Sequence, residues 1–166
     1  MPPDQYELYA EFGIASEKAQ LLEIEAGNYV LAFLGIFFKP DKISNEQRDF
    51  LKNLIDDMNH ATLGKLLKSV KGLAEFDESF LKLFDAALEQ RNYLAHHFFR
   101  SHNFAIYSAD GRKVMIEELK SIQRQLDIAH ASLSAASTCL NKISGLPTVT
   151  DEQLKKWTEQ GKRVGI

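Results

Sequence analysis

The sequence predicts an all-α protein, an up-and-down bundle of four main helices with additional short helices. Apolar residues recur at intervals of three and four along most of the chain, as they do on one face of a helix. Residues that start and stop helices separate these periodic segments, and no run of alternating β-branched residues is long enough for a strand. We therefore expect one helical domain over residues 1–166, with Gly161 to Ile166 as a frayed tail.

Length, composition and charge are those of an ordinary globular protein. The 166 residues are 45% hydrophobic and 26% charged, which is sufficient to bury a core. The net charge of −3 provides no global basic field, so a nucleic-acid site must be a local patch. Cys139 is the only cysteine, which excludes an internal disulfide framework and favours a reducing compartment.

Neither membrane insertion nor secretion is expected. The longest apolar run, Tyr29 to Phe38, is about half of the ~20 residues that a membrane-spanning helix needs. The N-terminal segment carries acidic residues where a secretion signal carries basic ones. The expected location is therefore cytoplasmic, with no membrane partner.

Local start and stop signals divide the first half of the chain into helices. The first long helix is expected from Ser16 to Phe38, because Pro40 disfavours helix in the residue before it. Ser44 and Gln47 have the spacing of a capping box at the start of the second helix. Thr62 is the expected N-cap of the third helix, LGKLLKSVKGL.

Two longer helices follow. Asp77 is the expected N-cap of a helix over 78–100, and Glu78 has a favourable charge in its first turn. Ser108 to Arg112 is a turn by composition. The helix after this turn has an unbroken apolar seam formed by Met115, Leu119, Ile122, Leu126, Ala129, Leu133, Ala136, Leu140 and Ile143. Such a seam suits antiparallel bundle packing or a coiled coil.

The C-terminal region contains one further signal that ends a helix and one further signal that begins a helix. Gly145 and Pro147 are expected to end the long helix. Thr150 and Gln153 have the spacing of a second capping box, which predicts one short last helix.

The helix over 78–100 places an arginine among apolar residues. At ~100° per residue, one apolar arc contains Phe80, Phe84, Ala87, Leu88, Leu94, Ala95 and Phe98. Arg91 falls near the centre of this arc. A second, polar stripe contains Asp85, Glu89, Asn92, His96 and Arg100. His96 lies ~140° round the helix from Arg91, so the two side chains flank one edge of it.

A guanidinium in an apolar arc is costly unless it is paired, since breaking a buried ion pair costs ~3–5 kcal/mol. Two explanations are open for Arg91. One is a structural ion pair with an acid on another helix, such as Glu23, Glu25 or Asp57. The other is that the arc opens at this point to a cavity or to a partner chain.

The segment LEQRNYLAHHFF resembles the signature of the HEPN superfamily. That signature is an arginine, four to six residues and then a histidine, and a polar residue usually follows the arginine. Arg91, Asn92 and His96 fit it with four intervening residues, and His97 fits it with five. An all-helical chain with this motif near the end of a middle helix, before a long helix, agrees with the resemblance.

The resemblance implies a helical bundle that forms a homodimer and brings two motifs into one cleft. Many members are metal-independent endoribonucleases of toxin–antitoxin, phage-defence or RNA-processing systems. Others are inactive and serve as dimerising or ligand-binding modules, and some work beside a separate nucleotidyltransferase. The implied partners are thus an RNA substrate, a second copy, and an antitoxin or a nucleotidyltransferase, with no cofactor.

The residue types suit RNA cleavage, because RNA carries its own nucleophile, the 2′-hydroxyl. A histidine titrates near neutral pH and can move protons, so His96 is the expected acid–base group. Arg91 can meet the charge that develops on phosphorus. Asn92, one turn before His96, could orient the imidazole or bond the RNA. Weaker candidates for substrate contacts are His97, Tyr93 and Arg100, although a solvated His97 and a packing role for Tyr93 are the more ordinary readings.

The aromatic residues near the motif predict that the protein is a dimer. Phe98, Phe99 and Phe104, together with the apolar arc around Arg91, provide more apolar surface than one bundle needs.

Two rival sites have more ordinary explanations. The acid–histidine pairs Asp57/His60 and Asp127/His130 have a spacing found in di-metal bundles, with Glu23 and Glu89 as possible further ligands. Aspartate is short for that role, so surface pairs and no metal site are expected. A basic patch could be formed by Lys65, Lys68, Lys71, Arg112 and Lys113, but such charges usually form a solvated helix face.

Overall fold

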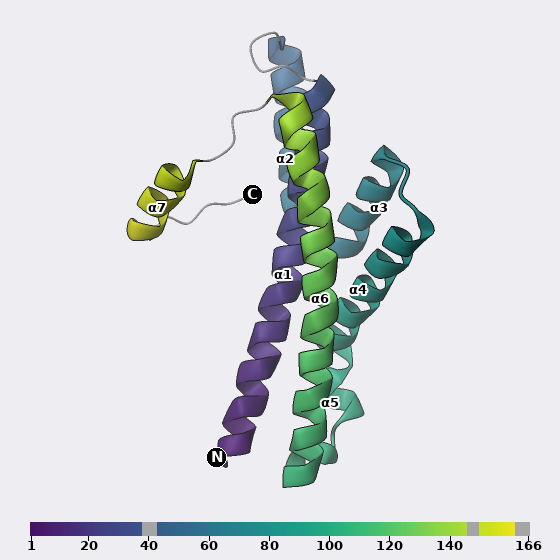
Figure 1. Cartoon of the computed structure of the whole chain (residues 1–166), viewed down its shortest axis with the longest axis vertical. Helices are drawn as coiled ribbons and strands as arrows, with labels where there is room; N and C mark the ends of the chain where they lie inside the picture. Colours follow the sequence, from purple (N-terminus) through teal and green to yellow (C-terminus); the bar gives the residue numbers. More distant parts are fainter. Residues whose placement is uncertain (38–42, 146–149, 162–166) are drawn as a thin grey trace.

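The computed structural model describes residues 1–37, 43–145 and 150–161, and these residues form an all-α bundle (Figure 1). The described part contains seven α-helices and one 3₁₀ helix, and no strand. These are α1 (Pro3–Phe37), α2 (Asn45–Asn59), α3 (Leu63–Leu73), α4 (Glu78–His96), α5 (Phe98–Ser101), η2 (Ala105–Tyr107), α6 (Ala109–Ser144) and α7 (Asp151–Glu159). The predicted fold class is therefore confirmed.

Helices α1 and α6 form a long antiparallel pair, and α3 and α4 pack on one side of it (Figure 1). The seam predicted for α6 is buried from Met115 to Leu133, whereas Ile143 at its end is 71% exposed. The side chains of α1 that are buried in the core are Leu8, Ala15, Ala19, Leu22, Ala26, Tyr29, Val30 and Ala32. Burial at intervals of three and four on both helices is what holds the pair together.

The first helix begins much earlier than predicted, at Pro3 instead of Ser16. Leu8 is completely buried against the core, so the N-terminal turns gain packing that the local sequence does not reveal. Pro3 is compatible with this start, because the first helical residue has no intrahelical partner for its N–H. The predicted end, with Phe38 and Pro40, lies outside the described residues.

Three of the predicted helix caps are formed as expected. Ser44 and Gln47 bond each other's backbone N–H in a capping box, as do Thr150 and Gln153 at α7. The Asp77 carboxylate accepts hydrogen bonds from Ser79 and Phe80, and these bonds lower its pKa. Thr62 is the N-cap of α3, but its side chain makes no capping hydrogen bond.

Two predicted boundaries around the motif were wrong. The helix expected over 78–100 breaks at His97, where ψ is −26° and φ is −127°, and α5 begins at Phe98. This break lets the Phe98 side chain enter the core, where it is completely buried. The segment expected as a turn, Ser108 to Arg112, is the N-cap and first turn of α6.

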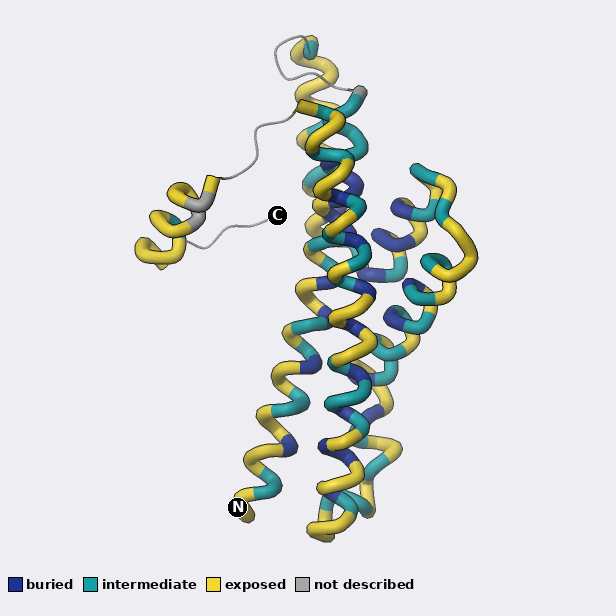
Figure 2. Tube along the Cα trace, viewed as in Figure 1, coloured by how far each residue is buried: buried dark blue, intermediate teal, exposed yellow. Residues whose placement is uncertain are grey.

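The C-terminal end of α6 agrees with the prediction, since Gly145 caps it in the left-handed conformation at φ 65°. Pro147 and the last five residues of the expected tail lie outside the described residues. Figure 2 shows that most of the described residues of α7 and much of α2 are exposed, and Met58 is the buried residue of α2. No helix in the described ranges has both the length and the apolar character to cross a membrane.

Candidate functional site

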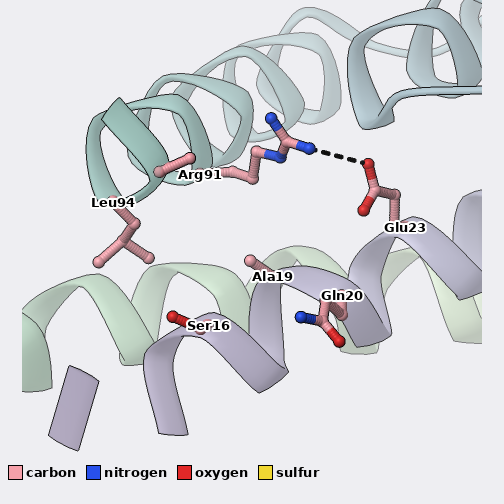
Figure 3. A pocket seen from close by; sticks show the side chains of 7 residues that line it. Ser16, Ala19, Gln20, Glu23, Arg91 and Leu94 are labelled. Carbon is pink, nitrogen blue, oxygen red and sulfur yellow. Dashed lines mark hydrogen bonds and ion pairs between the residues drawn. The ribbon is translucent and has the colours of Figure 1, made fainter. Parts of the chain in front are cut away.

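The predicted arginine lies at an open groove between α1 and α4. The groove has a volume of about 420 Å³ and is lined by Ser16, Ala19, Gln20 and Glu23 of α1 and by Arg91, Leu94 and Ala95 of α4. Figure 3 shows the Arg91 side chain extending along the groove toward Glu23. Both explanations offered for an arginine in the apolar arc therefore apply together, because Arg91 has a carboxylate partner and also borders a cavity.

The contacts of the Arg91 guanidinium are few and long. Its Nη2 lies 3.3 Å from Glu23 Oε1, and its Nη1 donates to Asn92 Oδ1 at 3.3 Å. Charge-assisted N–H···O bonds are usually about 2.7–2.9 Å. The Arg91 side chain remains 25% exposed. The guanidinium is thus held at a wall of the groove without being sealed in the core.

Glu23 is held more firmly by a different partner. Its Oε1 accepts a 2.6 Å hydrogen bond from the backbone N–H of Leu63, the first residue of α3. Glu23 thereby provides the capping acceptor that the Thr62 side chain does not, and it places a negative charge at the positive end of α3. The sequence predicted Thr62 for this role, because a cap from another helix leaves no local signal.

Asn92 and His96 are both exposed on the side of α4 that faces solvent. Together with Asp85, Glu89 and Arg100 they form the predicted polar stripe, all of whose members are exposed. His96 is the last residue of α4 and does not line the groove. Within one chain, the structure brings Arg91 and Asn92 into contact but leaves His96 on the adjoining surface.

His97 and Arg100 lie on the same exposed end of the motif. The ring centroids of His96 and His97 are 6.3 Å apart, and His97 occupies the break between α4 and α5. Neither imidazole, nor the Arg100 guanidinium, has a hydrogen bond or ion pair with another residue in the described part of the chain. These three groups are therefore available to a ligand in solution.

Tyr93 points into a second polar cluster and does not line the groove. Its hydroxyl lies 3.4 Å from His102 Nε2, and this nitrogen lies 2.6 Å from Glu118 Oε2. Burial raises the pKa of Tyr93, and the interaction with Glu118 raises it further. The cluster joins α4 to α6 and supports the packing role for Tyr93. Nothing in the sequence signalled it, since Tyr93 lies in α4, His102 follows α5, and Glu118 lies in α6.

The rival sites are not assembled. Asp127 pairs with Lys18 at 2.5 Å, and among the described residues there is no group of three side chains that could hold a metal ion. The alternative of a basic patch is incomplete, because Arg112, one of its five residues, is only 8% exposed and bonds Asp4 and the Ile106 carbonyl. Lys71 is also neutralised, by Asp85 at 2.5 Å.

No protein-family model, curated protein or solved structure matches this chain. Any assignment of this chain to a class of proteins therefore rests on the motif, on the helical architecture and on the geometry of the groove.

Proposed function

We propose that this protein is a HEPN-like, metal-independent endoribonuclease that acts as a homodimer. The observation that carries the proposal is the state of Arg91, a guanidinium that borders an open groove and is held by two 3.3 Å contacts. A purely structural buried arginine would need short, saturated contacts to offset its desolvation. An arginine that binds a phosphate must be accessible from solvent, and a phosphate must be able to replace its existing contacts.

The chemistry requires no bound metal ion. The 2′-hydroxyl attacks the adjacent phosphorus, the bond from phosphorus to the 5′-oxygen breaks, and the products carry a 2′,3′-cyclic phosphate and a 5′-hydroxyl. His96 takes the proton of the 2′-hydroxyl or supplies the proton of the leaving oxygen. Arg91 stabilises the charge on the phosphorane, and Asn92 holds the guanidinium or the RNA.

The homodimer supplies what one chain lacks at the groove. His96 lies outside the groove of its own chain, so a second copy that brings its α4 end alongside would complete a cleft with two arginines and two histidines. The further partners in this proposal are an antitoxin or a nucleotidyltransferase, as in toxin or defence systems. An adjacent gene for either protein would support a role in such a system, and the proposed location is the cytoplasm.

The test compares the parent protein with Arg91→Ala and His96→Ala on labelled single-stranded RNA in the presence of EDTA. We expect cleavage by the parent to 2′,3′-cyclic phosphate ends, and loss of cleavage in both variants with melting temperatures close to the parent's. Arg124→Ala is the control, since Arg124 is an exposed arginine of α6 that does not line the groove. Full activity in His96→Ala would transfer the catalytic assignment to His97 or reject it.

A second candidate is an inactive HEPN-like binding or dimerisation module. The observation that favours it is the Glu23 carboxylate, which already neutralises Arg91 in the free chain. A well-folded parent protein that binds RNA or a protein partner without cleaving any RNA would select this candidate.

A further inference from the structure

We infer that the Glu23 carboxylate is an internal competitor for the phosphate site at Arg91 and lowers the affinity of the free protein for RNA. The inference rests on the proposed function, because it concerns the regulation of the same groove. Glu23 and a phosphate are both anions, and both would use the guanidinium of Arg91 as their cation.

Glu23 is anchored independently of Arg91. The same oxygen, Oε1, accepts the 2.6 Å bond from Leu63 and the 3.3 Å contact from Arg91. The shorter bond belongs to the N-terminus of α3, where a negative charge is favourable. Glu23 would therefore stay in place when Arg91 turns to a phosphate, and the cap of α3 would be kept.

Arg91 can exchange its partner at little cost. A guanidinium has five N–H donors, and the described contacts use two nitrogens at 3.3 Å each. A phosphate can accept two parallel bonds from the same group and form shorter ones. At 25% exposure the guanidinium need not cross the core in order to do so.

Glu23 also lies between the groove and a second hollow beside it. A neighbouring hollow of about 200 Å³ shares Gln20 and Glu23 with the groove and extends to Met58, Asn59 and Ala61 at the end of α2. An RNA strand that runs from Arg91 toward this hollow would pass the carboxylate. The negative charge of Glu23 therefore acts against the polyanion at the junction of the two hollows.

The competition predicts a gain of RNA affinity when the charge is removed and the shape is kept. Glu23→Gln retains an oxygen that can accept from Leu63 and Arg91 but carries no charge. A partly exposed ion pair contributes up to about 1 kcal/mol, so we expect RNA to bind more tightly by up to about fivefold. Releasing the guanidinium should also make the affinity fall more steeply with salt concentration.

The experiment measures binding of a fluorescent single-stranded oligoribonucleotide by anisotropy, in proteins that carry His96→Ala so that the probe stays intact. Glu89→Gln is the matched control, because it makes the same change of net charge at an exposed residue of α4. The set also includes Arg91→Ala and the double variant of Glu23→Gln with Arg91→Ala. The gain from Glu23→Gln should be smaller in the double variant, since the part that acts through the Arg91 contact is lost and only the direct repulsion of RNA by Glu23 remains.

The outcomes separate the inference from the proposed function. If Arg91→Ala weakens RNA binding while Glu23→Gln behaves like Glu89→Gln, the competitor role is overturned and the RNA site remains. If Arg91→Ala has no effect on RNA binding, the proposed function itself falls. A Glu23→Gln protein that does not fold would show that the carboxylate is a structural ion, and this result would also overturn the inference.

Discussion

Two arginines of this protein illustrate at the residue scale how contact geometry separates a structural role from a ligand-binding one. Arg112 is 8% exposed, and it donates to Asp4 Oδ2 at 2.7 Å and to the Ile106 carbonyl at 2.9 Å. Arg91 is more exposed, and both of its contacts are 3.3 Å long. Arg112 thus links the N-terminal turn of α1 to η2 and α6, whereas the contacts of Arg91 can be replaced by those of a ligand.

This contrast predicts opposite effects on stability. Arg112→Ala should lower the free energy of unfolding by ~1–3 kcal/mol, because it leaves the partly exposed Asp4 carboxylate and the Ile106 carbonyl without their donor. Arg91→Ala should cost about 1 kcal/mol or less, since its partner Glu23 keeps the hydrogen bond from Leu63. Urea unfolding followed by circular dichroism measures both values. Equal losses for the two variants would mean that Arg91 is also a structural ion.

At the element scale, the first turn of α6 depends on a close approach that requires glycine. A Cβ atom on Gly111 would lie 2.1 Å from the Ala105 carbonyl oxygen of η2. The Gly111 N–H also bonds the Ser108 side chain, which caps the helix. The sequence predicted a turn here because of the glycine, but the glycine serves the packing of η2 against α6.

A pair of glycine substitutions tests this packing. Gly111→Ala should destabilise the protein by ~1–3 kcal/mol, because a backbone atom must move to admit the methyl group. Gly13→Ala, in the middle of α1 with nothing within 4 Å of its Cβ position, should stabilise it by ~0.5–1 kcal/mol through helix propensity. Thermal melting of both variants is sufficient to compare them. A neutral Gly111→Ala would contradict the close approach between η2 and α6.

Helix α4 shows why an element can be predicted while its end cannot. Its N-cap at Asp77 and its exposed polar stripe follow from local patterns and agree with the structure. Its end at His97 depends on the burial of Phe98 beneath Phe12 and Phe99, whose ring centroids lie 5.7 and 5.2 Å away. Because Phe12 comes from α1, the break is a product of tertiary packing.

At the scale of the whole molecule, α1 carries exposed apolar side chains that a second copy could cover. The aromatic residues that led to the prediction of a dimer are partly used within the chain, since Phe98 is completely buried and Phe99 packs on Tyr9 and Phe12. Apolar side chains of α1 that remain exposed are Tyr6, Tyr9, Ile14, Leu21 and Ile24. Ile24 borders the hollow next to the groove, so a partner here would also cover the site.

We therefore expect a homodimer of twice 18.8 kDa in light scattering at micromolar concentrations. The double variant Leu21→Glu with Ile24→Glu should shift the protein toward monomer and lower its RNA cleavage in parallel. Ile128→Glu, at a 57% exposed position of α6, is the control that should change neither. A parent protein that remains a monomer of 18.8 kDa throughout would rule out a cleft built from two motifs.

The sequence by itself determined the helical class, the capping boxes at Ser44 and Thr150, the long seam of α6 and the exposed stripe of α4. These features depend on neighbours within a few residues along the chain, and helix periodicity alone decides which of them share a face. For the candidate site, the sequence selected Arg91, Asn92 and His96 by their resemblance to a known signature and by their chemistry, but it did not reveal that His96 lies outside the groove that Arg91 borders.

Only the tertiary structure decided which of three carboxylates faces Arg91, and that Glu23 also caps α3 in place of Thr62. It likewise decided the early start of α1 at Pro3 and the contact of Tyr93 with His102. Each of these features depends on contacts between different elements of the structure. Their geometry depends on how the helices pack, and the sequence pattern of one helix carries no information about the side chains that its neighbour will present.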